Sequence, residues 1–172
     1  MASETYMQAF PFDSTSSPGN ETGFSSGTRI LTLRGEIAID KLRPGDRIVT
    51  RDAGARPLKA LHRRLRHGVR PCRIGTCALG NMRPARAIIL GADQPILLRD
   101  WRAHVLFGHR TAMVAVKRIA DGTFIRRTAT ARTLEMFLPD LGENHVVYIE
   151  GLEFGTSPVA VRTLEKSDGG RP

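Results

Sequence analysis

The chain has 172 residues, of which 41% are hydrophobic and 25% charged, and its formal net charge is +9. This length and composition fit one globular domain with a sizeable core and exclude a chain that is disordered throughout. No apolar run reaches the roughly 18 residues of a membrane span, and the N-terminus lacks the basic and apolar regions of an ordinary signal peptide. We therefore expect a soluble protein, whereas the sequence identifies neither its partner, its compartment nor its oligomeric state.

The positive charge is mostly arginine and is densest between residues 62 and 70. A candidate site for an anionic partner is formed there by Arg63, Arg64, Arg66 and Arg70. Basic surfaces attract phosphates and carboxylates. Nucleic-acid binding is not favoured, because the cluster offers no aromatic side chain apart from its histidines on which bases could stack. A solvated basic face explains the same residues, so the sequence leaves both interpretations open.

The first half of the chain predicts a leader followed by short strands. Residues 1–22 are rich in Ser, Thr, Pro, Gly and Asn and are interpreted as a flexible leader. After them, short apolar runs are interrupted by turn residues about every ten positions, which indicates an all-β domain over residues 23–160. Proline followed by glycine at residues 44–45 predicts a type II turn, and a second turn is expected at 52–54. Strands are expected at residues 30–33, 36–39, 47–50 and 56–66.

The second half repeats this pattern and ends in a C-terminal tail, residues 161–172. Further strands are expected at residues 86–90, 95–98, 103–107, 111–116 and 123–126. Helix is limited to a turn or two between Thr130 and Met136, and Trp101 is expected to pack in the core. Cys72 and Cys77 are too few for a disulfide framework and are interpreted as buried small hydrophobic residues.

An internal similarity relates the two halves of the predicted domain. Residues 38–48 align without a gap to residues 115–125, and Ala, Gly and the final Ile coincide. Chance agreement between two strand-turn-strand units is one explanation, because such units share turn chemistry. The preferred interpretation is a duplicated half-domain with pseudo-two-fold symmetry.

Five segments form an ordered set of motifs between residues 23 and 157, approximately. They are Gly27-Thr28-Arg29-Ile30, Leu42-Arg43-Pro44-Gly45-Asp46, Ala78-Leu79-Gly80-Asn81, Leu97-Leu98-Arg99-Asp100-Trp101-Arg102 and His145-Val146-Val147-Tyr148-Ile149-Glu150-Gly151. Together and in this order, these segments resemble bacterial members of the Hedgehog/intein (Hint) family of self-processing domains. The resemblance implies an all-β horseshoe fold built from two related halves.

The resemblance also implies which residues would perform an acyl shift. In active members a cysteine or serine attacks the preceding carbonyl, and a Thr/Ser-X-X-His block supplies a hydroxyl and a proton donor. Here Gly23 occupies the nucleophile position and the block falls on Gly91-Ala92-Asp93-Gln94, so Gly91 lacks the hydroxyl and Gln94 the acidic imidazole. A later family histidine falls on Leu138 or Pro139. Asp93 and His145 retain their family positions, and His145 is interpreted as structural.

Three hypotheses for function follow. The first is a Hint-fold domain that has lost autoprocessing and acts as a structural or interaction module. The second is an active self-cleaving domain that uses Ser25, two residues beyond the family position, or an unrecognised nucleophile. The third is a basic module that binds an anionic partner. No cofactor is expected, and no metal site, because the remaining histidines lack ligand spacing with a third partner. Those histidines are His62, His67, His104 and His109.

Overall fold

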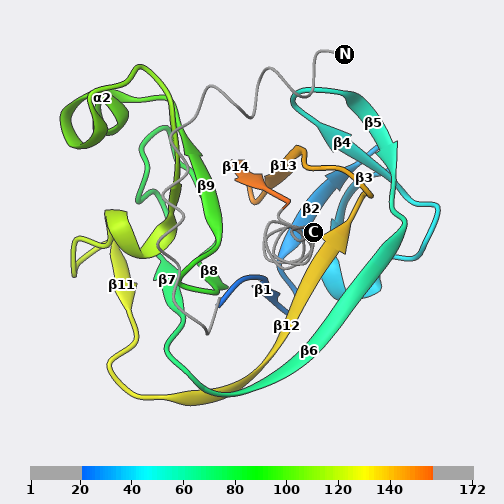
Figure 1. The fold of residues 1–172 in the computed structure, drawn as a ribbon, viewed down its shortest axis with the longest axis horizontal. Helices are drawn as coiled ribbons and strands as arrows, with labels where there is room; N and C mark the ends of the chain where they lie inside the picture. The colour runs from blue at the N-terminus through cyan, green and yellow to red at the C-terminus, as the bar shows by residue number, and fades with distance from the viewer. Residues whose placement is uncertain (1–20, 157–172) are drawn as a thin grey trace, which may run out of the picture.

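The computed structural model describes residues 21–156 (Figure 1). Most of the predicted leader, the end of the predicted domain and the predicted tail lie outside these residues. The described part is nearly all β, with two antiparallel sheets and one α-helix, which confirms the predicted fold class. None of its helices has the length and apolar character needed to cross a membrane.

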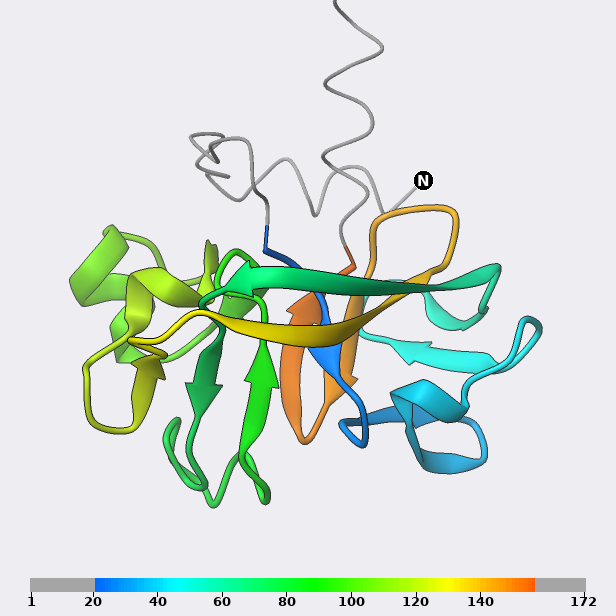
Figure 2. The same cartoon turned by 90° about the horizontal axis from the view of Figure 1, so that it is seen from below.

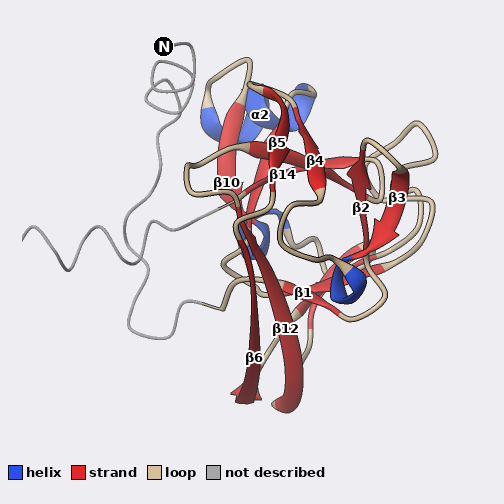
Figure 3. Cartoon of the chain, turned by 90° about the vertical axis from the view of Figure 1, so that its right-hand side faces the viewer, coloured by secondary structure: helices blue, strands red, loops and turns tan. Residues whose placement is uncertain are grey.

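The first sheet has six strands and contains the start of the domain. In spatial order they are β11 (Ile125–Arg127), β7 (Cys72–Ile74), β8 (Ile88–Leu90), β1 (Phe24–Ser25), β12 (Arg132–Asp140) and β6 (Ala60–Val69). β12 and β6 pair along most of their length and form a long curved ribbon on one side of the molecule (Figure 3). β1 lies between β8 and β12, so residues near the chain entry pair with two strands from much later in the chain.

The second sheet has eight strands and contains the end of the domain. In spatial order they are β10 (Ala112–Ala115), β9 (Pro95–Leu98), β14 (Leu152–Gly155), β13 (Val146–Ile149), β2 (Arg29–Thr32), β4 (Arg47–Thr50) and β5 (Gly54–Pro57), with β3 (Gly35–Ala38) paired to β2. β14 pairs with β9 and β13, which brings the last described residues beside the strand that follows the Gly91–Gln94 block.

The internal repeat is visible in the backbone. Ala38 ends β3 and leads into a 3-10 turn, η1 (Ile39–Lys41), with φ −60° and ψ 132°. Ala115 ends β10 and leads into η2 (Val116–Ile119) with φ −66° and ψ 136°. The first half also contains the predicted type II turn, because Asp46 N–H donates to Arg43 O at 3.0 Å and Gly45 has φ 94°. The two aligned segments therefore leave their strands in the same way.

Three local predictions were wrong. The predicted strand at 103–107 lies in helix α2 (Trp101–Phe107), because Asp100 caps its first turn and Gly108, at φ 72°, ends it. Conversely, the predicted helical turn after Thr130 is strand β12, whose pairing with β6 overrides local propensity. Trp101 is 64% exposed and not part of the core.

One large apolar core joins the two sheets, and the cysteines divide between core and surface. Cys72 is fully buried in that core, as predicted, and its burial raises the pKa of the thiol to about 11. Cys77 lies in the loop after β7 and is exposed, so the prediction of burial fails there. Both thiols are free.

Candidate functional site

The first described residues lie along the Gly91–Gln94 block. Gly91 N–H donates to Gly23 O at 2.9 Å, and Asp93 N–H donates to Glu21 O at 2.8 Å. In return, Glu21 N–H donates to the Asp93 carboxylate at 2.9 Å. The structure therefore brings together Gly23 and the block that the sequence predicted as its partner.

A buried glutamine joins the entry and the exit of the domain. Gln94 is 2% exposed. Its Oε1 accepts from Gly23 N–H at 2.9 Å, and its Nε2 donates to Gly155 O at 2.8 Å. We call Gly23, Gly91, Gln94 and Gly155 the junction.

An aromatic pair packs beside the junction. Phe24 and Phe154, which are the neighbours of Gly23 and Gly155 in the chain, meet edge to face with ring centroids 5.1 Å apart. Both rings are buried. One apolar contact and one amide therefore connect β1 to β14 at the same point.

At two of the three junction glycines, Gly23 and Gly91, neighbouring atoms fill the space that a side chain would need. A Cβ at Gly91 would lie 2.0 Å from Glu21 O and 2.7 Å from Thr22 N. At Gly23 a Cβ would lie 3.0 Å from Leu138 Cδ1, and its φ of +109° is a conformation that L-residues rarely adopt. The backbone of residues 21–23 thus passes where a threonine or serine at position 91 would stand.

Asp93 has partners that the sequence did not reveal. Its Oδ2 accepts from Glu21 N–H, and its Oδ1 lies 2.6 Å from Lys117 Nζ. Lys117 belongs to η2, the turn that the internal repeat relates to η1. The retained carboxylate therefore holds the chain entry in place, and the repeat alignment carried no signal for this role.

His145 forms a separate buried pair with Asp52. Nδ1 of His145 lies 2.8 Å from Asp52 Oδ2, and the other carboxylate oxygen accepts from Val146 N–H at 2.9 Å. His145 N–H donates to Thr156 Oγ1 at 2.9 Å. These contacts anchor the start of β13 to the end of β14 and to the turn after β4, which is consistent with a structural role. Nothing in the sequence marked Asp52 as the partner.

Of the remaining predicted positions, two hold apolar side chains and one holds a serine. Leu138 and Pro139 both lie in β12, where Leu138 contacts the Gly23 backbone region and Pro139 pairs with Leu61. Ser25 Oγ lies 3.5 Å from Thr28 Oγ1, at the start of the turn that leads to β2. An aliphatic pair and a serine bonded to a neighbouring threonine thus occupy these positions.

The four arginines of the basic cluster do not share one face. Arg63 and Arg64 are neighbours on β6 and point to opposite faces. Arg63 pairs with Glu135, and that hydrogen bond and charge raise the pKa of its guanidinium. Arg66 lies on the face of Arg64 and lines a small cavity beside Gly91. Arg70 follows the strand, and its backbone N–H donates to Glu21 Oε1 at 3.3 Å.

Within residues 21–156, no three His, Cys, Asp or Glu side chains lie close enough together to hold a metal ion. The only side chain that hydrogen-bonds to the Gly23 N–H in this part of the chain is the amide of Gln94. An amide neither donates nor accepts a proton as an acid or base near neutral pH. The junction is thus built for hydrogen bonding.

The chain is similar to known proteins in its sequence profile and in its fold. The Hint domain family profile matches residues 22–157. A variant of the MchDnaB-1 intein superposes with a TM-score of 0.50 at 13% identity, covering 78% of this chain and 99% of the intein. The intein-like domain from Clostridium thermocellum gives 0.48 at 15% identity, covering 78% and 97%. The gp41-1 intein gives 0.46 at 12% identity, covering 77% and 96%. No curated protein matches.

Proposed function

The chain belongs to the Hint domain family, and on that premise we propose that it is a Hint-fold domain that does not process itself. We propose that it acts as a structural or interaction module whose junction keeps the entry and exit of the domain side by side. The hydrogen bonds of Gln94 to Gly23 and Gly155 are the observation that carries this proposal.

An acyl shift at the Thr22–Gly23 bond would need three components. A side-chain nucleophile must attack the Thr22 carbonyl, an acid must protonate the departing nitrogen, and donors must stabilise the oxyanion. Gly23 has no side chain, and the group on its nitrogen is an amide. The first two components are therefore missing from the positions where the family resemblance places them.

The packing around Gly91 supports loss of activity beyond these two substitutions. The Glu21 carbonyl fills the space of a side chain at position 91. A hydroxyl residue there would require the entry segment to move by more than an ångström, because the clash is with backbone. Four hydrogen bonds hold that segment to residues 91–94.

A structural role fits the course of the chain. The first and last described residues lie on the same side of the molecule, next to β6, whereas the β13–β14 turn lies on the opposite side (Figure 2). A module of this shape holds its first and last described strands in a fixed arrangement through Gln94.

The intact mass of the full chain tests this proposal. After expression, the chain is incubated with and without hydroxylamine or a thiol, either of which captures an ester or thioester intermediate. We expect one species with the full-length mass under all conditions. A product that begins at Gly23 or Ser25 would establish the alternative, an active self-cleaving domain.

A second experiment asks how much of the site has changed. The double variant Gly23→Cys with Gln94→His restores a nucleophile and an imidazole, but leaves Gly91 and the path of Glu21 unchanged. We expect this variant to remain uncleaved. Gly23→Ala with Gln94→His is the matched control, since it adds the same Cβ without a thiol. Thiol-dependent cleavage of the cysteine variant alone would show that the rest of the centre is competent.

A further inference from the structure

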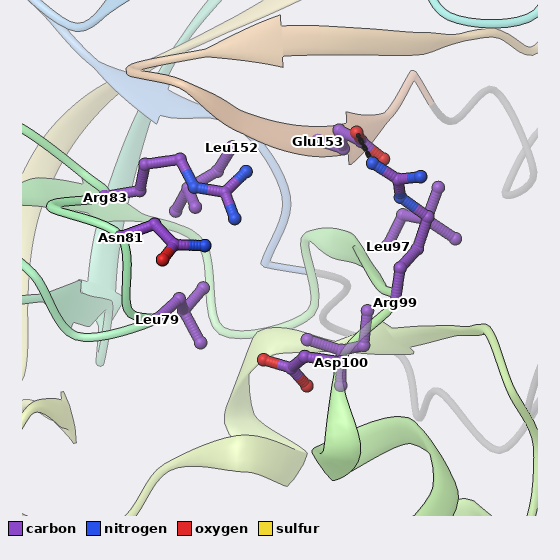
Figure 4. Close-up of a pocket in the computed structure, with 9 residues that line it drawn as sticks. Leu79, Asn81, Arg83, Leu97, Arg99, Asp100, Leu152 and Glu153 are labelled. Atoms are coloured by element: carbon purple, nitrogen blue, oxygen red, sulfur yellow. Dashed lines mark hydrogen bonds and ion pairs between the residues drawn. The ribbon is translucent and has the colours of Figure 1, made fainter.

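A groove lies on the side of the molecule away from the junction. Its volume is about 300 Å³, and its apolar floor comes from Leu79, Leu97, Leu98 and Leu152. The loop between β7 and β8 forms one wall, and the end of β9 with Asp100 forms the other (Figure 4). This volume is in the range of small-molecule and short-peptide sites.

One wall presents a guanidinium group that no residue of the described part of the chain neutralises. Arg83 has no side-chain hydrogen bond or ion pair within residues 21–156. Its aliphatic stem lies over Gly151, with Cγ 3.6 Å from where a Cβ would stand. Figure 4 shows the Arg83 guanidinium and the Asn81 amide directed into the groove.

The loop that carries these two side chains has an unusual backbone. Cys77, Asn81 and Met82 have φ values of 60°, 50° and 57°. Such values are uncommon outside glycine, and they persist where the surrounding structure fixes them, often around ligands. Hydrogen bonds close the loop, among them Leu79 N–H to Arg83 O at 3.1 Å.

The opposite wall contains a buried carboxylate oxygen without a donor. Glu153 has a side chain that is 8% exposed, and its Oε1 accepts from Arg51 at 3.2 Å and from Arg99 at 2.8 Å. Its Oε2 is buried and has no hydrogen-bond partner within the described residues. Because this oxygen is closed to solvent, Glu153 holds Arg99 in the wall of the groove and is not itself a contact for a ligand.

We propose that this groove binds an acidic, aliphatic peptide segment. A carboxylate of the peptide pairs with Arg83 and Asn81, and an aliphatic side chain covers the leucine floor. A simple anion satisfies Arg83 but not the floor. A peptide supplies both groups, so the combination selects it over inorganic phosphate.

Peptide binding to the full-length chain tests the proposal. The probe is acetyl-Leu-Glu-amide, and the matched control is acetyl-Leu-Gln-amide, which has the same shape without the charge. Trp101 is the only tryptophan of the chain and directly follows Asp100, so its fluorescence serves as one reporter. Methyl NMR signals of Leu97 and Leu152 report on the floor. We expect a Kd below about 1 mM for the glutamate peptide and at least tenfold weaker binding of the glutamine peptide.

Two arginine variants locate the binding site. Arg83→Gln is expected to weaken binding of the glutamate peptide at least tenfold. Arg56→Gln removes the same charge from an exposed position of β5, outside the groove and outside the basic cluster, and is expected to leave the Kd within twofold. Circular dichroism and the unfolding midpoint confirm that both variants fold. Equal affinity for the two peptides, equal effects of the two variants, or no binding at 5 mM peptide would each overturn the proposal.

Discussion

Replacing Gln94 with methionine tests the central claim that this residue holds the domain ends together. Methionine has nearly the same volume and length, so the change removes hydrogen bonds without opening a large cavity. Gly23 N–H and Gly155 C=O then lose their partner in a buried environment. Leaving one buried polar group unpaired costs about 1–3 kcal/mol.

For the two groups together we expect a loss of about 3 kcal/mol in the free energy of unfolding. For a domain of this size such a loss lowers the thermal midpoint by about 6–12 °C. Urea unfolding followed by circular dichroism measures the change, and the slope m should stay constant because the surface exposed on unfolding is unchanged. A loss below about 0.5 kcal/mol would refute the reasoning.

A second substitution at the same position separates the two hydrogen bonds. In Gln94→Glu, an ionised carboxylate still accepts from Gly23 N–H, but it faces the Gly155 carbonyl without a proton to donate. The pKa of this carboxyl should therefore be higher in the folded state than in the unfolded state. Its stabilising contribution is then present at low pH and is lost as the pH rises. The difference in the free energy of unfolding between Gln94→Glu and the wild type should therefore become smaller as the pH falls.

Three further predictions concern other residues. Gly91→Ala should lower the free energy of unfolding by about 3 kcal/mol, because the new Cβ meets backbone atoms. The control Gly35→Ala, where φ is positive but the space around the residue is open, should lower it by only about 1–2 kcal/mol. Urea unfolding measures both losses. A backbone N–H donor holds the pKa of Asp40 below its ordinary value. The stabilising contribution of Asp40 is therefore present above the unfolded-state pKa and is lost as the pH falls. In melting curves recorded at several pH values, Asp40→Asn should remove this contribution to the loss of stability in acid. With a thiol reagent, the folded chain should react once, at exposed Cys77, and a second time at buried Cys72 only in urea; two equally fast reactions would contradict the described core.

The sequence was informative wherever local chemistry decides the backbone. Proline followed by glycine at residues 44–45 specified a type II turn, and the structure contains the corresponding hydrogen bond. The repeat between residues 38–48 and 115–125 predicted two similar units, and both leave their strand through an alanine of the same conformation. These features depend on neighbours in the chain, which a single sequence displays.

Local sequence patterns gave wrong predictions where tertiary contacts or helix caps outweigh the secondary-structure propensity of a segment. Residues 103–107 have the composition of a strand, but Asp100 and Gly108 satisfy the free backbone groups of a short helix. The stretch after Thr130 pairs with β6, a strand more than sixty residues earlier in the chain. Exposure of Trp101 follows from its place in α2 and is invisible to a composition argument.

The sequence by itself determined the family, the all-β class and the identities of the residues at positions 23, 91 and 94. Only the tertiary structure decided what those residues do now. It showed that the Glu21 carbonyl lies where a side chain of residue 91 would stand, and that Gln94 reaches the ends of strands separated by more than a hundred residues. A sequence motif shows which residues have been substituted. The hydrogen bonds and packing contacts that these residues make depend on chain segments that meet only in the folded protein.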